Sequence, residues 1–365
     1  MPDFSIGVDL GGTNLRIAAV STQGELLEKV TLGSKAAPTR DQVIGQMCDA
    51  IQHLSAKYRA AGNLLGAGIG VPGIIDMATG TIRKSVNLPG WEDYPVRAEI
   101  ERRLHARVVL DNDARVAALG EQWLGAGRGV SNMAMITLGT GIGGAIVLGG
   151  KLFYGMNGMA GEFGHVTLEP EGVPCGCGNR GCAERYASAS AILRMAREAI
   201  ATGEAPSLAA ASSDAQLGAQ SIYNLAMQGD EPARRIFQTF GRYLGIMLAG
   251  AVNVLNLDKF VIGGGVASAW DAFAPKMFEE LRTRSVVYAA TTPADPLGSE
   301  KVTWGRAHSP APAEQSSAAA GARDVSSLVP ANEYDAPARI TIITRALLGG
   351  DAGLYGAARS AALAG

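Results

Sequence analysis

The sequence predicts an α/β protein built from two related sheets. Apolar strand patterns alternate with helical patterns along most of the 365 residues, which is typical of this fold class. One design, an apolar strand, a glycine turn and a second apolar strand, occurs twice, at residues 5–20 and 133–148. Such repetition indicates an internal duplication. The chain length suits two domains or one large duplicated unit, with a sizeable buried core.

The elements between and after the hairpins follow from hydrophobic periodicity and turn signals. Apolar residues at helical spacing predict a helix over residues 41–62, with Gly62 as its C-cap. Residues 291–337, rich in Ala, Pro and Ser, predict a long flexible loop or insertion. The other predicted elements are strands at 64–71 and 106–110, helices at 114–124 and 231–255, a strand at 260–263 that ends in a glycine turn, a strand at 340–343 and a helix at 351–363.

Net charge and cysteine usage exclude several classes of function. The chain has 32 Lys and Arg against 34 Asp and Glu and no long basic block, so nucleic-acid or membrane-surface binding has no electrostatic support. No stretch is apolar enough to span a bilayer, and the N-terminus lacks the pattern of a secretory signal. The few cysteines are mostly clustered, which fits a reducing compartment. We therefore expect a cytoplasmic protein.

The glycine turns have the chemistry of anion sites. Consecutive backbone N–H groups in such turns bind phosphate oxygens, and a threonine hydroxyl adds a donor. Neither turn is a P-loop or a dinucleotide fingerprint, because both lack the Gly-Lys-Ser/Thr ending and lead into a strand. A single turn is equally well explained as a tight β-turn, but two in matching positions and a third glycine run favour phosphate binding. The residues are Asp9, Gly11, Gly12, Thr13 and Asn14 in the first turn, Gly139, Thr140, Gly141 and Gly143 in the second, and Gly263, Gly264 and Gly265 in the third.

Three of the four cysteines, Cys175, Cys177 and Cys182, lie in one glycine-rich loop. The C-x-C spacing and the glycines let several sulfurs turn toward one centre. Thiolates are soft donors that suit Zn²⁺, and a tetrahedral site needs a fourth ligand, for which His165 is the nearest candidate. The alternative, a redox or disulfide cluster, is disfavoured because C-x-C geometry makes poor structural disulfides. Four protein ligands leave no open position on zinc, so we expect a structural ion.

Together these motifs resemble the ROK family (repressors, open reading frames and kinases), within the actin/hexokinase/Hsp70-type ATPases. The motifs are D-L-G-G-T-N from Asp9, L-G-T-G-I-G-G from Leu138, E-F-G-H from Glu162, C-G-C-G-N-R-G-C-A-E from Cys175 and V-I-G-G-G from Val261, and the resemblance covers about residues 5–288 and resumes at about 340. It implies two ribonuclease-H-like domains around a cleft, with MgATP held by the glycine turns and a sugar at the cleft floor. The implied small domain comprises 1–112 and 348–365, including the C-terminal helix. The implied large domain, 113–347, carries the zinc loop and the 291–337 insertion.

The resemblance also implies the sugar site. Asp113 follows a predicted strand and precedes a helix, a place where ligands gather in α/β folds and where a helix N-cap is equally common. By resemblance Asp113 is the catalytic base, which accepts the proton of the sugar hydroxyl. Asp9 is expected to orient Mg²⁺ through water. Carboxylates, amides and a neutral imidazole suit sugar hydroxyls, and the matching positions are Asn87, Asn112, Asp113, Glu162, His165 and Glu184. If His165 binds zinc through one ring nitrogen, the other is free to face the sugar.

The chain departs from the family pattern directly after the predicted base. Where the family usually continues Asn-Asp-Ala with Asn-Ala, this chain has Arg115 and Val116. Three alternatives stay open for Arg115: it contacts phosphate, it lowers the pKa of Asp113, or it points to solvent.

The resemblance implies an ATP-dependent kinase that phosphorylates a hexose at its 6-hydroxyl. Residues 182–188 and 87–91 are most similar to the glucokinases of the family, which favours glucose. Kinases for fructose, mannose, N-acetylglucosamine and N-acetylmannosamine are alternatives, because they share most of the motifs. A sugar-responsive repressor would need a helix-turn-helix before the first glycine turn, where only eight residues stand, and the sugar-site residues disfavour a structural ATPase of the actin type. The expected ligands are the sugar, ATP, Mg²⁺ and a structural Zn²⁺, with no nucleic-acid or membrane partner, in a homodimer or homotetramer.

Overall fold

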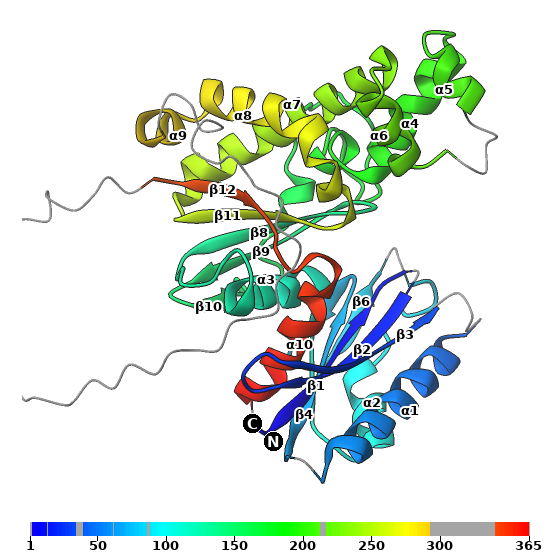
Figure 1. The fold of residues 1–365 in the computed structure, drawn as a ribbon, viewed down its shortest axis with the longest axis vertical. Coiled ribbons are helices and arrows are strands. Elements are labelled where there is room, and N and C mark those ends of the chain that lie inside the picture. Colours follow the sequence, from blue (N-terminus) through cyan, green and yellow to red (C-terminus); the bar gives the residue numbers. More distant parts are fainter. Residues whose placement is uncertain are drawn as a thin grey trace, which may run out of the picture.

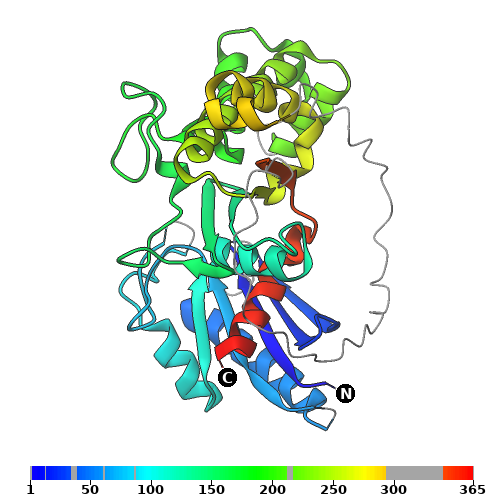
Figure 2. The same cartoon turned by 90° about the vertical axis from the view of Figure 1, so that its left-hand side faces the viewer.

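The computed structural model describes residues 2–12, 14–33, 39–60, 62–85, 88–211, 217–292 and 340–364. Within these ranges two five-stranded sheets form the centres of two lobes, which lie one above the other in Figure 1. The small lobe is built on the sheet β3-β2-β1-β4-β7, and the large lobe on the sheet β10-β9-β8-β11-β12. Helices α3 and α10 pack on each other where the lobes meet (Figures 1 and 2).

The small lobe contains β1 (Phe4–Leu10), β2 (Asn14–Ser21), β3 (Leu26–Gly33), α1 (Arg40–Tyr58), β4 (Leu64–Val71), β5 (Ile74–Asp76), β6 (Thr81–Lys84), α2 (Val96–Leu104) and β7 (Val108–Asn112). Helix α3 (Asp113–Leu124) leads into the large lobe. The large lobe contains β8 (Met133–Leu138), β9 (Ile142–Leu148), β10 (Lys151–Phe153), α4 (Ala189–Ala201), α5 (Pro206–Ala211), α6 (Ala219–Met227), α7 (Glu231–Leu255), β11 (Lys259–Gly263), α8 (Trp270–Arg284), α9 (Val286–Thr291) and β12 (Ile342–Arg345). Short 3-10 turns are η2 (Phe163–His165), η3 (Ala183–Arg185), η4 (Gly265–Ala269) and η6 (Gly349–Asp351), and α10 (Ala352–Ala364) returns to the small lobe.

The two sheets have the same strand order and the same strand directions. Strand β1 pairs antiparallel with β2 and parallel with β4, and β8 pairs in the same senses with β9 and β11. The outer strands β7 and β12 are both parallel to their neighbours. The internal duplication predicted from the two hairpins is therefore present in the fold.

Glycines let α10 lie directly on the small sheet. Alternate residues of β1, among them Ile6 and Val8, are buried in a core shared with α1 and α2. Between them, a Cβ at Gly7 would collide with the carbonyl oxygen of Leu354 in α10, and a Cβ at Gly68 of β4 would collide with α10 in the same way. The high glycine and alanine content of the chain thus reflects close backbone packing at this face.

The large sheet also lies between two cores, because alternate side chains of its strands point to opposite faces. Met133 and Met135 of β8 are buried in a cluster with residues of α3. Ala134 and Ile136, which point to the other face, belong to the core formed with α7 and α8. Helix α3 therefore packs on the large sheet as well as on α10, and its first residues are held by both lobes.

Several predicted boundaries need correction. The predicted C-cap at Gly62 is wrong, because α1 ends at Tyr58 with Arg59 as its C-cap. Gly62 instead lies where a Cβ would be 2.6 Å from the carbonyl oxygen of Pro2. The helix predicted at 351–363 is α10, shifted by one residue, and follows the turn η6.

Two strands begin two residues later in the chain than predicted, because their pairing with the neighbouring strand begins there. The strand predicted at 106–110 is β7, which pairs with β4 only from Val108 onward and extends to Asn112. The strand predicted at 340–343 is β12, whose pairing with β11 starts at Ile342. Of the insertion predicted at 291–337, only residues 291 and 292 are described, and the rest lies outside the described residues. Within the described ranges, no helix has the length and apolar content that a membrane span requires.

Glu121 joins the two segments that cross between the lobes. It is fully buried in the last turns of α3. Its Oε1 accepts a hydrogen bond from the N–H of Leu348 at 2.8 Å, and its Oε2 accepts from Leu347 at 3.1 Å and from Ala126 at 2.8 Å. Leu347 and Leu348 lie between β12 and α10, so this carboxylate holds the returning chain against α3.

Replacing Glu121 with alanine is expected to lower the free energy of unfolding by about 3 kcal/mol, because three enclosed N–H groups lose their acceptor. Denaturation followed by circular dichroism measures the change. The control Glu25→Ala removes an exposed carboxylate and is expected to stay within about 0.5 kcal/mol of wild type. Equal stabilities of the two variants would contradict this role for Glu121.

Candidate active site

The predicted base lies at the junction of β7 and α3. The N-cap of α3 is Asn112, whose Oδ1 accepts a hydrogen bond from the N–H of Ala114 at 2.9 Å. Its Nδ2 donates to the carbonyl oxygen of Gly73 at 3.3 Å. The N-cap role, which was the alternative for Asp113, thus belongs to its neighbour. Asp113 is the first helical residue, where the helix dipole favours a carboxylate.

Asp9 and Asp113 form a pair of acidic groups at one edge of the small sheet. Asp9 pairs with Gly70 and Gly70 with Asp111, so the ends of β1, β4 and β7 are aligned. Desolvation raises the pKa of Asp113. Burial and the charge of Asp113 raise the pKa of Asp9 to about 6, although Arg16, whose Nη1 is 3.3 Å from Oδ2 of Asp9, lowers it in part. This negative edge suits a hard cation such as Mg²⁺.

The raised pKa of Asp9 predicts a pH-dependent effect on stability. Since the folded-state pKa of about 6 lies above the ordinary aspartate pKa of 3.8, ionised Asp9 destabilises the folded protein. This cost is fully present above pH 6 and disappears as the pH falls toward 3.8. Asp9→Asn is therefore expected to raise the free energy of unfolding at pH 7.5, by up to about 3 kcal/mol in Mg²⁺-free and nucleotide-free buffer.

The gain from Asp9→Asn is expected to shrink between pH 7.5 and pH 5. Thermal or chemical denaturation of both proteins at the two pH values measures it. A gain that is the same at both pH values would contradict the raised pKa, because the amide does not titrate.

The second and third glycine turns meet close to the base. A Cβ at Gly143 would lie 3.2 Å from the Cβ of Ala114, the residue that follows Asp113. Gly264, at φ 84°, packs so tightly on Leu138 that a Cβ there would collide with its backbone. The β8–β9 turn and the end of β11 therefore share one edge of the large sheet, next to the start of α3.

Some of these glycines are not required by packing within the described residues. A Cβ at Gly139 or Gly265 would meet no described atom within 4 Å, and one at Gly11 would meet only the carbonyl oxygen of Asn14 at 3.4 Å. Open backbone of this kind suits close approach by an anionic ligand. The structure places Asp9, Gly11, Gly12 and Asn14 at the β1–β2 turn, Gly139, Thr140, Gly141 and Gly143 at the β8–β9 turn, and Gly263, Gly264 and Gly265 at the end of β11, whereas Thr13 and Asn87 lie outside the described residues.

The cysteine loop and His165 form a compact cluster. The ligand atoms of His165, Cys175, Cys177 and Cys182 all lie within 4.8 Å of one another. The Sγ atoms of Cys177 and Cys182 are 3.7 Å apart, and Sγ of Cys175 is 3.8 Å from Nδ1 of His165. Zn–S bonds of about 2.3 Å in a tetrahedral site place neighbouring sulfurs about 3.8 Å apart. The donor set and its spacing therefore fit zinc.

The protonation of the three thiols depends on their surroundings. Burial raises the pKa of Cys175 and of Cys182, whereas the N–H of Asn179 lowers the pKa of Cys177. All three cysteines are free thiols, so the structure contains no disulfide in this loop. Because zinc binds thiolates, zinc binding at this cluster would release protons and would strengthen with rising pH.

The predicted sugar residues on the large lobe surround this cluster. Nδ1 of His165 faces the thiols, while its Nε2 lies 4.0 Å from Oε2 of Glu162. Oε1 of Glu184 accepts a hydrogen bond from Sγ of Cys175 at 3.0 Å. Its Oε2 lies 2.5 Å from the place that a Cβ of Gly141 would occupy. Glu184 therefore connects the cysteine loop to the second glycine turn.

Arg115 is buried, so the alternative that it points to solvent is wrong. Its Nε lies 2.5 Å from Oδ1 of Asp111, and its charge lowers the pKa of Asp113, though less than desolvation raises it. The spacing of Asp111 and Arg115, four residues apart, is the signal that sequence reasoning missed. Tyr154, whose O–H donates to Oδ2 of Asp111 at 2.8 Å, carries no sequence signal, because only the fold brings it there.

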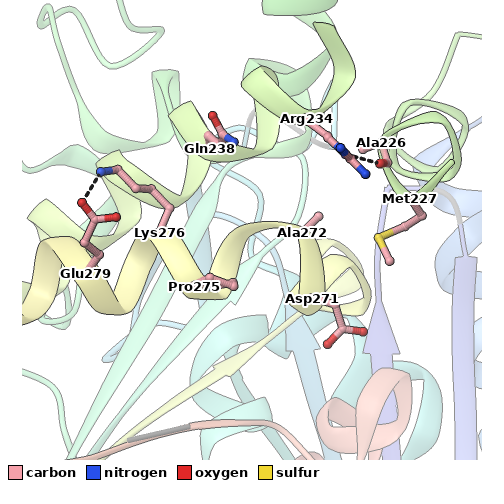
Figure 3. Close-up of a pocket in the computed structure, with 9 residues that line it drawn as sticks. All are labelled: Ala226, Met227, Arg234, Gln238, Asp271, Ala272, Pro275, Lys276 and Glu279. Carbon is pink, nitrogen blue, oxygen red and sulfur yellow. Dashed lines mark hydrogen bonds and ion pairs between the residues drawn. The ribbon is translucent and has the colours of Figure 1, made fainter. Parts of the chain in front are cut away.

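A separate cavity of about 620 Å³ lies between α6, α7 and α8 (Figure 3). None of the predicted site residues that the structure describes lines it. Two of its charged side chains already have partners, since Lys276 pairs with Glu279 at 2.7 Å and Arg234 donates to the carbonyl oxygen of Ala226 at 3.2 Å. This cavity is therefore separate from the predicted site residues around Asp113 and the glycine turns.

Comparison with known proteins agrees with the motifs. The profile of the ROK family matches residues 5–322. The glucokinase of Halalkalibacterium halodurans is 39% identical over 293 residues, which are 80% of this chain and 87% of that protein. The glucokinase of Thermotoga maritima is 38% identical over 284 residues, 78% of this chain and 87% of that protein. The crystal structure of a ROK family glucokinase from Streptomyces griseus in complex with glucose and AMPPNP matches with a TM-score of 0.72 at 30% identity, covering 98% of both chains.

Proposed function

The chain belongs to the ROK family, and we propose that it is an ATP-dependent glucokinase that transfers the γ-phosphoryl group of ATP to the 6-hydroxyl of glucose. Its fold is the two-domain actin/hexokinase type. Identity of 38–39% to two glucokinases supports glucose as the substrate. The observation that carries the proposal is the position of Asp113, a desolvated carboxyl beside the second glycine turn. Glu184, a proposed sugar ligand, approaches the same turn at Gly141.

In the proposed reaction Asp113 is the general base. Its carboxylate accepts the proton of the 6-hydroxyl while that oxygen bonds to the γ-phosphorus, and the bond from the γ-phosphorus to the β–γ bridging oxygen breaks to release ADP. The raised pKa of Asp113 makes it a stronger base than an ordinary aspartate. Backbone N–H groups of the glycine turns bind the phosphate oxygens, apart from those of Gly11 and Gly139, which donate to carbonyl oxygens within their own turns. Asp9 is the residue that would hold Mg²⁺, and this ion, when bound, would neutralise phosphate charge.

The proposed sugar contacts come from both lobes. Glu162 and Glu184 accept hydrogen bonds from glucose hydroxyls, and Nε2 of His165 donates one. Asn112 contributes from the small lobe, and Asn87 is a further proposed sugar ligand. His165, through Nδ1, and the three cysteines would hold a structural Zn²⁺, which would leave Nε2 of His165 available for the sugar. Support for this arrangement is the clustering of the four donor atoms within 4.8 Å of one another and the position of Nε2, 4.0 Å from Oε2 of Glu162.

The proposal extends to organisation in the cell. We take residues 1–112 and 348–365 as the small domain and 113–347 as the large one, with α3 and the segment held by Glu121 as the two crossings. We also propose that the enzyme is cytoplasmic, has no nucleic-acid partner and assembles as a homodimer or homotetramer. Light scattering of the purified protein tests the assembly.

A coupled assay of ADP release over a panel of sugars tests the function. The panel contains glucose, fructose, mannose, N-acetylglucosamine and N-acetylmannosamine, each with MgATP. The highest kcat/KM is expected with glucose. A higher kcat/KM with any other member would replace glucose as the substrate, and ADP release that no sugar stimulates would contradict a sugar kinase.

A further inference from the structure

Asp111 and Arg115, two residues before and two residues after the proposed base, form a buried ion pair. Nε of Arg115 is 2.5 Å from Oδ1 of Asp111, and the two side chains are only 5% and 2% exposed. The same Oδ1 accepts a hydrogen bond from the N–H of Asn112 at 2.7 Å. The carboxylate of Asp111 thus contacts both the backbone N–H of Asn112, directly before Asp113, and the side chain of Arg115, two residues after Asp113.

The large lobe supplies further partners for this pair. The O–H of Tyr154 donates to Oδ2 of Asp111 at 2.8 Å, and the guanidinium of Arg115 lies 5.2 Å from the centre of the Tyr154 ring. Nη1 of Arg115 donates to the carbonyl oxygen of Gly158 at 2.6 Å. Residues 154–158 follow β10 and lead to Glu162. The pair therefore connects the turn that carries the base to the segment that carries a proposed sugar ligand.

The surroundings give the 154–158 segment room to move. Residues 154–159 line one wall of a hollow of about 580 Å³, and residues 74–78 of the small lobe line another. Nη2 of Arg115 lies 3.6 Å from Sδ of Met77, which lines the hollow from the small lobe. Arg115 thus contacts both walls, and loss of its guanidinium would free the 154–158 segment to shift into the hollow.

We propose that Arg115 and Tyr154 are positioning residues for phosphoryl transfer. Through Asp111 they fix the direction of the Asp113 carboxylate, and through Gly158 Arg115 fixes the spacing between the base and the Glu162 segment. The inference rests on the proposed glucokinase function, in which Asp113 is the base. Neither residue needs to touch the substrate, because a misplacement of about 1 Å in a catalytic group costs about 100-fold in rate.

The first test separates turnover from binding. Tyr154→Phe removes the O–H that holds Asp111 but keeps the ring over Arg115. Its kcat with glucose is expected to fall about 10-fold while the glucose KM stays within about twofold of wild type. Tyr58→Phe is the matched control, because the O–H of Tyr58, the last residue of α1, donates at 3.1 Å to the carboxylate of Glu28 in β3, away from the site. The control is expected to keep wild-type kcat.

The second test uses two replacements of Arg115. Arg115→Lys keeps a charge near Asp111 but loses the fork that also reaches Gly158, whereas Arg115→Met loses both. We expect kcat to fall in both variants, with Lys recovering at least about fivefold over Met, and the glucose KM to rise severalfold in both, because the Glu162 segment is no longer held. Circular dichroism gives the folded fraction, to which each kcat is normalised.

The outcomes distinguish this inference from the function on which it rests. A wild-type enzyme that does not phosphorylate glucose overturns the proposed function. If wild type is active, unchanged normalised kcat in Tyr154→Phe, or equal kcat and KM in Arg115→Lys and Arg115→Met, would overturn the positioning role and leave only a contribution to stability.

Discussion

Asp113→Asn is expected to lower kcat for glucose phosphorylation by about 10²–10⁴-fold. The amide has nearly the shape of the carboxylate but does not accept the hydroxyl proton, and general-base catalysis contributes rate factors of this size. Since α3 is capped by Asn112, the substitution leaves the helix start intact. Glucose binding, measured by calorimetry in the absence of nucleotide, is therefore expected to persist within about 10-fold of wild type, because only one of the proposed sugar contacts is altered.

The control for Asp113→Asn is Asp49→Asn, which makes the same chemical change on the exposed face of α1. Its kcat is expected to equal that of wild type. A kcat within about threefold of wild type in Asp113→Asn would show that another group accepts the proton, since so small a loss is below the range for a general base. Loss of both activity and glucose binding would instead show a structural role for this carboxylate.

Cys177→Ser is expected to lose bound zinc and to lower the melting temperature by about 10 °C or more, because the binding energy of a structural zinc is folding energy. The glucose KM is expected to rise with it. Without the metal, His165 and the loop that carries Glu184 lose the contact that fixes them beside the second glycine turn. Metal analysis, calorimetric melting and steady-state kinetics of the same preparation measure the three effects.

Cys48→Ala is the matched control for Cys177→Ser, because Cys48 is a buried thiol of α1 outside the cluster. It is expected to retain one zinc per chain and its glucose KM. If Cys177→Ser keeps both wild-type melting and wild-type glucose KM while zinc is absent, the ion has no structural role.

The parts of the site that follow local patterns were predictable from the sequence. The two hairpins were visible as apolar strands on either side of glycine turns, and the structure shows them as the leading strands of two sheets with equal topology. The C-x-C spacing predicted a thiol cluster, which the structure forms with His165. In each case the residues that make the feature are neighbours in the chain, or repeat at a fixed spacing, so local rules were sufficient.

The features that the sequence did not reveal depend on contacts between distant segments. The sequence left three alternatives open for the role of Arg115. Its partners include Tyr154 and Gly158, which only the docking of the large lobe brings near α3. Glu121 gave no signal as a buried carboxylate, since two of its three donors come from residues more than 200 positions away. Gly62 was assigned to a cap by its place after a helical pattern, but close approach of Pro2 and Asp3, which precede β1, explains it.

Direct identification of the product tests the central claim. Purified enzyme, glucose and MgATP are incubated, and the phosphorylated sugar is identified by phosphorus–proton correlation NMR. Transfer through a 6-hydroxyl held at Asp113 predicts glucose 6-phosphate and an equal amount of ADP, with at least about 100-fold less product from Asp113→Asn on the same timescale. Phosphate on any other carbon, or ADP formed without a phosphorylated sugar, would contradict the claim.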